Sequence, residues 1–263
     1  MQHLKLHIIP SDLLEQYKTE FLETTLSNFD SLHESDLSIE TFSFYTSVSA
    51  VFSSRIEGEN IELDSFIKHK RLGVKYQPDY TRKIDDLYDA YQFAQQSNIS
   101  QKTINQAHAV LTKHILQKSG QGRFRADNMF VLTKEGRIEY VAAAPEKVKD
   151  EMAKFSRDIE TLLKIELSFE ETLFFASLIH LVFVKIHPFQ DGNGRTARLL
   201  EKWFIAQRLG SKAWFIQSER HYYEKHQTYY NNIRQLGLEY EELDYSRALP
   251  FLKMLPEAMN FKD

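Results

Sequence analysis

The residues from Phe169 to Ile186, FEETLFFASLIHLVFVKI, constrain the fold more than any other segment of this chain. Acidic residues are confined to the first turn after Ser168, and the rest of the segment is apolar on nearly every side. A helix that is apolar all round is normally buried in a core. The least polar stretch, residues 173–184, falls short of the roughly 20 residues that span a bilayer and contains His180. We therefore expect this helix at the centre of a fold that does not cross a membrane.

Other helices are expected around this one because glycine and proline are sparse, with nine and six among 263 residues. The pattern predicts helices over residues 12–29 (begun by Ser11), 36–57, 79–97, 100–116, 145–164 (begun by Pro145), 195–209 and 219–236, then a helical segment from Tyr240 interrupted at Pro250. In residues 130–141, two β-prone runs flank a turn that contains Gly136, which predicts a β-hairpin. No repeat or long linker divides the chain, so we expect one domain that is otherwise all-α.

Composition argues against several classes of protein. Without cysteine, the chain has no disulfide framework, no thiolate zinc site and no thiol nucleophile. The 33 basic and 37 acidic residues give a net charge of −4, whereas a dedicated nucleic-acid binder carries a basic surplus. His221 and His226 are not at the HExxH spacing of a zinc site. The N-terminus lacks the continuous apolar stretch of a signal peptide, so we expect a cytoplasmic protein.

One twelve-residue segment, HPFQDGNGRTAR, gathers the residue types that nucleotide chemistry requires. Pro188 would end the central helix and leave His187 at its C-terminus. There the helix dipole would keep the pKa of the imidazole near neutrality, which suits a general base. Gly192 and Gly194 around Asn193 would form a tight turn at the start of the next helix. Its free N–H groups would then cradle an anion such as phosphate.

Two arginines and one acidic residue complete this segment. Arg195 and Arg198 would lie in the first turn of the next helix, where two positive charges oppose the helix dipole unless an anion binds there. Their guanidinium groups can form paired hydrogen bonds with phosphate. Asp191 offers an oxygen ligand for Mg²⁺, which usually binds one or two carboxylates together with phosphate oxygens. The combination indicates phosphoryl or nucleotidyl transfer.

The segment resembles the signature of the Fic family, HPFx[DE]GNGRxxR, at every defined position, and the resemblance extends over residues 40–240 or so. It implies an all-α Fic-type helical bundle with a small β-hairpin flap next to the active site. It also implies a single Fic domain over residues 1–263. That domain would comprise N-terminal helices in 1–60, with an inhibitory helix at about 41–57, a catalytic core at about 80–240 and a helical tail at 240–263.

The resemblance further implies a protein adenylyltransferase, which transfers AMP from ATP to a Ser, Thr or Tyr hydroxyl of a target protein and releases pyrophosphate. His187 would deprotonate the hydroxyl, and Asp191 would hold Mg²⁺ on the α- and β-phosphates. The backbone of residues 192–194 and the Asn193 side chain would cradle the phosphates, while Arg195 and Arg198 would hold the β- and γ-phosphates. The flap would align the target by β-augmentation, through Val131, Leu132, Thr133, Ile138, Glu139 and Tyr140. Near the region of the family's adenine pocket lie four tyrosines for which core packing is expected: Tyr222, Tyr223, Tyr229 and Tyr230.

A second match, SSRIEG, runs from Ser53 to Gly58 and resembles the family's inhibitory motif, [ST]xxxE[GN]. Gly58 would end a helix in a left-handed conformation, which leaves the Glu57 carboxylate at the unfavourable end of the dipole. Such a group gains from a cationic partner, and the resemblance makes that partner Arg198. Glu57 would then block the γ-phosphate site, so that the isolated protein inhibits itself.

Two alternatives stay open. The same fold can transfer phosphate or another nucleotide, or remove AMP from a modified protein, since an inhibitory glutamate can also position water. A different class is a non-enzymatic regulatory or binding protein, although too few residues follow Tyr240 for an added winged helix. A protein substrate is expected in the first case, with self-modification and a homo-oligomer also open, and no nucleic-acid or membrane partner is expected.

Overall fold

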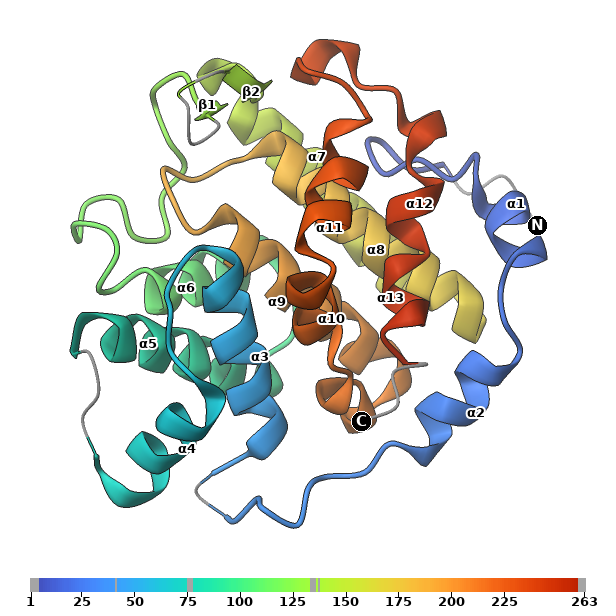
Figure 1. The fold of residues 1–263 in the computed structure, drawn as a ribbon. Coiled ribbons are helices and arrows are strands. Elements are labelled where there is room, and N and C mark those ends of the chain that lie inside the picture. Colours follow the sequence, from blue (N-terminus) through green and yellow to red (C-terminus); the bar gives the residue numbers. More distant parts are fainter. Residues whose placement is uncertain (1–4, 41, 75–77, 133–135, 137, 260–263) are drawn as a thin grey trace.

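The computed structural model describes residues 5–40, 42–74, 78–132, 136 and 138–259 (Figure 1). Most of them are helical, and two short strands form the one sheet found in this part of the chain. The helices are α1 (Leu14–Thr19), α2 (Thr24–Ser31), α3 (Phe44–Ile56), α4 (Leu63–Leu72), α5 (Pro78–Gln95), α6 (Gln101–Leu111), α7 (Pro145–Lys164), α8 (Phe169–Ile186), α9 (Asn193–Leu209), α10 (Ser218–Glu224), α11 (His226–Arg234), α12 (Leu249–Leu252) and α13 (Met254–Glu257). The strands are β1 (Phe130–Leu132) and β2 (Ile138–Val141). The expected all-α architecture with one small hairpin is therefore confirmed.

Helix α8 is the buried central helix that the sequence predicts. It begins with a capping box, in which the Ser168 side chain accepts from the N–H of Glu171 and the Glu171 side chain accepts from the N–H of Ser168. Residues 171–183 are all buried, and α9, α7, α1 and α12 pack around the helix (Figure 1). Among the described helices, none combines the length and apolar character that crossing a membrane requires.

Two N-terminal helices differ from the prediction. The expected helix over 12–29 is two short helices, α1 and α2, and Ser11 contributes its backbone carbonyl rather than a side-chain cap. The expected helix over 36–57 begins only at Phe44. Here Ser43 caps α3 by accepting from Thr46, and the Ser38 hydroxyl accepts from the N–H of Phe44. Serine side chains that bond to nearby backbone in this way favour turns and helix N-termini over helix interiors. The helix therefore begins after Ser43 and not at residue 36.

The C-terminal half also departs from the expected elements. The helix predicted over 219–236 is split at Lys225 into α10 and α11. The break brings the rings of Tyr222 and Tyr229 into a stack with centroids 5.0 Å apart, although seven residues span about 10 Å along a continuous helix. Pro250 occupies the first turn of α12, where proline is tolerated, so it starts a helix instead of interrupting one. Helix α4 was not predicted. Gly73, which ends this helix in a left-handed conformation, is the signal in the sequence that could have indicated it.

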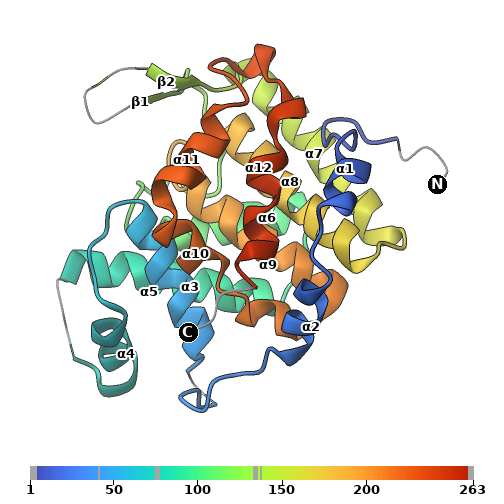
Figure 2. The ribbon, with the colours of Figure 1, turned by 45° about the vertical axis from the view of Figure 1, so that its right-hand side comes forward.

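The predicted hairpin is present and projects from the helical body (Figure 2). Its strands are antiparallel, with Phe130 opposite Val141, and an irregularity in register follows Val131. The hairpin is tied to the body because the N–H of Val141 donates to the carbonyl of Leu238 at 2.8 Å. Thr133, expected in the flap, lies outside the described residues.

We expect the Asp158→Ala variant to unfold more easily than the wild type. The buried Asp158 carboxylate of α7 accepts from three consecutive backbone N–H groups, those of His7, Ile8 and Ile9, at 2.7–3.0 Å. Leaving such donors unpaired costs about 1–3 kcal/mol. Chemical denaturation measures the loss, and hydrogen exchange should become faster at residues 7–9. Asp158→Asn, which keeps an acceptor oxygen, is the matched control, and equal losses in both variants would contradict this prediction.

Candidate active site

His187 ends α8 in an uncommon backbone conformation. Its φ of 52° and ψ of 58° lie in the left-handed region, and in the described part of the chain no other non-glycine residue has a positive φ. Pro188 cannot continue the helix, so the chain turns here into the loop that follows. The imidazole Nδ1 lies 3.1 Å from the carbonyl oxygen of Val184. This contact assigns the proton to Nδ1 and leaves Nε2 with the lone pair that a general base needs.

The pKa of His187 corrects the expectation of a value near neutrality. Burial lowers the pKa to about 4, against the opposing effect of the Val184 carbonyl. The positive charge of Arg125 adds to the decrease, whereas Glu57 and Asp191 act against it. Desolvation of the imidazolium therefore outweighs the helix dipole. At pH 7, His187 is neutral and ready to accept a proton.

The Asn193 side chain holds the loop together. Its Oδ1 accepts from the N–H of Phe189 at 2.9 Å, and its Nδ2 donates to the carbonyl of Phe189 at 2.8 Å. The residue is fully buried. This corrects the expectation that the Asn193 side chain faces phosphate, and it leaves the backbone of residues 192–194 for that role.

His108 of α6 supports the same loop, and the sequence pattern did not reveal it. The N–H of Gly122 donates to its Nδ1 at 2.9 Å, so Nε2 carries the proton and donates to the carbonyl of Asp191 at 2.8 Å. The imidazole also stacks on Phe189, with ring centroids 3.6 Å apart. No spacing in the sequence connects position 108 with position 191, so this support becomes visible only in the fold.

The free energy of unfolding should decrease as the pH is lowered, because burial lowers the pKa of both His108 and His187 to about 4. The unfolded chain binds protons on these residues near pH 6.5, while the folded chain does not. The contribution of these two histidines to the free energy of unfolding is therefore fully present above pH 6.5. It is lost between pH 6.5 and 4, by up to about 3 kcal/mol for each histidine. Chemical denaturation at several pH values measures the slope. The His108→Gln variant should show a smaller slope, and an unchanged slope would contradict this prediction.

Two positions at the start of α9, Gly192 and Gly194, have no room for a Cβ atom. Gly192 has a φ of 79°, and a Cβ there would lie 2.7 Å from the Cγ2 of Thr112. A Cβ on Gly194 would lie 2.5 Å from the Oε1 of Glu57. The first N–H groups of a helix have no acceptor within it and favour an anion. In this structure, the anion beside the start of α9 is the Glu57 carboxylate.

Arg198 is held by the C-terminal end of α3. Its Nη2 donates to the Glu57 Oε1 at 2.6 Å, and its Nε donates to the Ser53 Oγ at 2.8 Å. It also donates to the Ser53 carbonyl at 3.0 Å and to the Tyr229 hydroxyl at 3.3 Å. Arg198 is 1% exposed. The pair between Glu57 and Arg198 that the motif predicts is therefore present, and Ser53 belongs to it.

The charges of this pair stabilise each other. Burial acts to raise the pKa of the Glu57 carboxyl, but the nearby Arg198 and Arg195 outweigh burial and lower it. Burial likewise acts to lower the pKa of Arg198, and its neighbours Tyr229 and Glu57 raise it instead. Glu57 also follows α3 as its C-cap, before Gly58 with a φ of 96°. The predicted placement of a carboxylate at this helix end is therefore correct.

Arg195 has a partner that the sequence analysis missed. Its Nη2 donates to the Glu59 Oε1 at 2.6 Å, and both side chains are almost fully buried. Lys83 of α5 lies 3.6 Å from the same oxygen. Arg195 is otherwise 3.9 Å from the Asp191 carboxylate. The two arginines of the segment are thus each paired with a carboxylate from residues 57–59, and Glu59 could have been suspected from its position two residues after Glu57.

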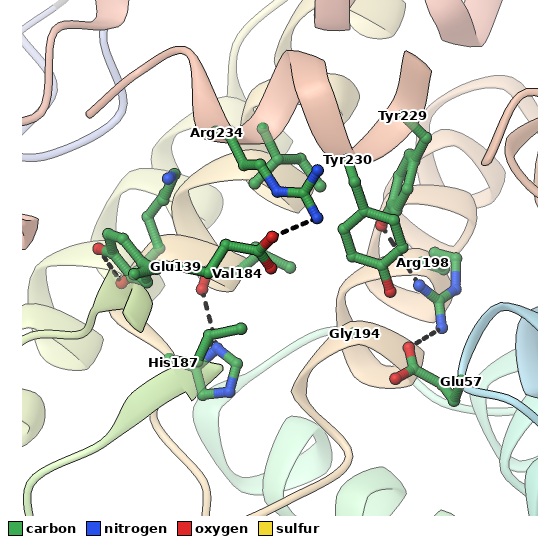
Figure 3. Close-up of a pocket in the computed structure, with 13 residues that line it drawn as sticks. Glu57, Glu139, Val184, His187, Gly194, Arg198, Tyr229, Tyr230 and Arg234 are labelled. Carbon is green, nitrogen blue, oxygen red and sulfur yellow. Dashed lines mark hydrogen bonds and ion pairs between the residues drawn. The ribbon is translucent and has the colours of Figure 1, made fainter. Parts of the chain in front are cut away.

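His187 and the Glu57–Arg198 pair lie on opposite sides of one cavity of about 140 Å³ (Figure 3). From the flap, Val131, Glu139 and Tyr140 line it, while Leu132 and Ile138 of the predicted flap set are exposed. The Glu139 carboxylate forms an ion pair with Arg234, which connects the flap with α11 across the cavity. Tyr229 and Tyr230 also line it, whereas Tyr222 is a core residue bonded to Glu201 and Tyr223 contacts Arg55.

Metal ligands are few in this region. The described residues contain no group of three or more His, Cys, Asp or Glu side chains that could hold a metal ion. The Asp191 side chain, however, is 56% exposed at the tip of the loop, with one carboxylate oxygen accepting from the N–H of Gly192. A single exposed carboxylate fits an ion that takes its other ligands from phosphate and water.

Part of this chain is similar to known proteins. The model of the Fic/DOC family matches residues 98–205. A protein adenylyltransferase Fic from Nematostella vectensis is 41% identical over 110 residues, which are 39% of this chain and 22% of the relative. A uridine 5'-monophosphate transferase from Xanthomonas campestris pv. campestris is 44% identical over 76 residues, which are 25% of this chain and 12% of the relative. The match thus spans less than a quarter of each curated relative.

The fold is also similar to that of a solved structure. A Fic family protein from Desulfovibrio desulfuricans superimposes with a TM-score of 0.70 at 19% identity, covering 82% of this chain and 64% of that one. The likeness thus covers most of the described helices, beyond the stretch that the family model matches. Residues 98–205 of this chain therefore match the Fic/DOC family, within a helical fold like that of a Fic family protein.

Proposed function

We propose that this protein transfers AMP from ATP to a Ser, Thr or Tyr hydroxyl of a target protein and releases pyrophosphate. The observation that carries the proposal is the position of a neutral His187 across one cavity from the glycine-lined start of α9. This arrangement places a base opposite a site that favours phosphate. The relative from Nematostella vectensis, named a protein adenylyltransferase, supports AMP as the transferred group.

In this mechanism, the Nε2 of His187 accepts the proton of the target hydroxyl. The hydroxyl oxygen forms a bond with the α-phosphorus of ATP, and the bond from that phosphorus to the bridging oxygen breaks. The N–H groups at residues 192–194 stabilise the charge of the phosphate oxygens. Arg198 and Arg195 would bind the β- and γ-phosphates once they leave their carboxylate partners.

Asp191 would hold a Mg²⁺ ion that accompanies the nucleotide. When bound, this ion would neutralise charge on the phosphate oxygens and so favour departure of pyrophosphate. The exposed Asp191 carboxylate is the group available for it, and the bond from Gly192 to one of its oxygens fixes the orientation of that carboxylate. His108 also helps to fix the position of Asp191, because it donates to the backbone carbonyl of that residue.

The flap would hold the target segment beside His187. Its strands place Val131, Glu139 and Tyr140 along the cavity, and the exposed Leu132 and Ile138 lie next to them on the hairpin. An extended segment added to this edge would bring its hydroxyl toward the base. Tyr230 lies on the opposite wall, where its ring can contact the nucleobase.

We also propose that Glu57 inhibits this activity. Its carboxylate lies against Gly194 and binds Arg198, so it occupies space and charge that the nucleotide phosphates need. The remaining cavity of about 140 Å³ is smaller than the roughly 300–1,000 Å³ of pockets that bind drug-sized ligands. Productive binding of ATP therefore requires Glu57 to move away.

The class of reaction can be tested with ATP that carries label at the α- or the γ-phosphate. The Glu57→Gly variant is incubated with Mg²⁺, either ATP and a cell lysate, and protein-bound label is measured. Label that forms with the Glu57→Gly/His187→Ala double variant comes from the lysate and is subtracted. The proposal predicts that the remaining label comes from α-labelled ATP only, and remaining γ label would show phosphate transfer. Label from neither form would favour removal of AMP from modified proteins or a non-enzymatic binding role.

Transfer of another nucleotide is the second candidate, since one matching relative is named a uridine 5'-monophosphate transferase. The same reaction with α-labelled UTP separates the two possibilities. Unlabelled ATP should compete with UTP far better than UTP competes with ATP if AMP is the natural group. Location in the cytoplasm, self-modification and self-association stay predictions from the sequence.

A further inference from the structure

Arg125, in the loop between α6 and β1, binds the backbone that carries His187. Its Nε donates to the carbonyl oxygen of His187 at 2.7 Å, and its own N–H donates to the carbonyl of Pro188 at 3.0 Å. A longer contact of 3.4 Å reaches the carbonyl of Ile186. The last carbonyls of a helix have no partner within it and carry partial negative charge. One arginine therefore fixes the end of α8 at the point where the chain turns into the loop.

The same guanidinium also reaches the base of the flap. Its Nη2 donates to the carbonyl of Ala143, two residues after β2 ends, and its Nη1 donates to the carbonyl of Asp127 at 2.8 Å. Arg125 is buried, and each acceptor that its guanidinium reaches in the described part of the chain is a backbone carbonyl. Such a planar fork of donors sets both distance and angle between the segments that it joins.

We infer that Arg125 is the positioning residue of the general base, because it holds the left-handed turn at His187 and fixes that turn relative to the flap. Without it, a non-glycine residue in the left-handed region would relax toward a more favourable conformation. The imidazole would then move relative to the hydroxyl that the flap presents. This inference rests on the proposed function for its kinetic consequences.

The charge of Arg125 has a second effect on the imidazole. Together with burial, it keeps His187 neutral, while Glu57 and Asp191 favour the protonated form. The other charged side chains that line the cavity are Lys185 and Arg198 and the paired Glu139 and Arg234. Removing the positive charge of Arg125 should therefore raise the pKa of His187, in addition to loosening its position.

The test compares Arg125→Met, which loses both fork and charge, with Arg125→Lys, which keeps the charge. Arg123→Met is the matched control, because Arg123 is an exposed residue of the same loop. All are made in the Glu57→Gly background, and transfer from α-labelled ATP is measured against pH. Arg125→Met should lower kcat by about 10²-fold with little change in KM for ATP. In this variant, the acid limb of the curve of rate against pH should shift toward pH 6.5. Arg125→Lys should keep the acid limb of the parent and recover part of kcat, and Arg123→Met should match the parent.

A second measurement does not depend on activity. Titration of the His187 ring by NMR, assigned with His187→Gln, should show a higher pKa in Arg125→Met than in the parent. An unchanged ring pKa and an unchanged kcat would overturn the inference. So would a loss of kcat that comes with equal loss of ATP affinity and no shift of the acid limb, since that pattern indicates general damage to the fold. If no variant transfers label, the proposed function is wrong. The titration of the His187 ring then tests by itself whether Arg125 acts on His187.

Discussion

The His187→Ala substitution, made in the Glu57→Gly background, should lower kcat for AMP transfer by about 10²–10⁴-fold. This is the usual contribution of a positioned general base. The Nε2 of His187 is free to accept a proton, because Nδ1 bonds to Val184 and burial lowers the pKa to about 4. The affinity for ATP should change little, since His187 lies across the cavity from Arg198. Initial rates with α-labelled ATP and calorimetric titration with ATP measure the two quantities.

The matched control is His33→Ala, the same substitution at an exposed position outside the cavity. It should leave both quantities unchanged. If His187→Ala retains most of the activity while its thermal unfolding is unaffected, another group accepts the proton and the mechanism is wrong.

The Glu57→Gly substitution should raise the rate of AMP transfer by about 10- to 100-fold. That range corresponds to the roughly 1.5–3 kcal/mol of a hydrogen bond between charged groups, here the 2.6 Å bond from Arg198 to Glu57. The variant also removes the carboxylate that lies beside Gly194, which frees the start of α9 for phosphate. Steady-state rates of wild type and variant at equal ATP concentration measure the increase.

Ser53 and Ser54 offer a pair of controls for this account. Both are fully buried, but the Ser53 hydroxyl accepts from Arg198, whereas the Ser54 hydroxyl finds no partner among the described residues. Ser53→Ala should change the rate in the same direction as Glu57→Gly, by less, and Ser54→Ala should leave it unchanged. No acceleration in Glu57→Gly, with intact fold and ATP binding, would contradict inhibition by Glu57.

The sequence predicted the central elements because their patterns are strong and local. The apolar segment of α8, its Ser168 cap and the hairpin at 130–141 all appear where expected. The pair between Glu57 and Arg198, 141 positions apart, came from the family motif rather than from any local pattern. A contact between distant residues was predicted only where a motif named both partners.

Contacts between distant segments account for what the sequence did not predict. Three residues that lie outside the segment 187–198 bond to it, each to a residue at least 60 positions away. They are His108 of α6, Glu59 after α3 and Arg125 of the loop before β1. Their residue types alone do not distinguish them from surface residues. The pKa of His187 was also mispredicted, because the helix dipole can be read from sequence but burial by neighbouring elements cannot.

The most direct test of the account is tandem mass spectrometry of a protein modified by Glu57→Gly with Mg²⁺ and ATP. We expect one AMP group on the hydroxyl of a Ser, Thr or Tyr residue, scarce with the wild-type protein and absent with the Glu57→Gly/His187→Ala double variant. A phosphate group alone on that residue, or an AMP adduct equally abundant with the double variant, would contradict it.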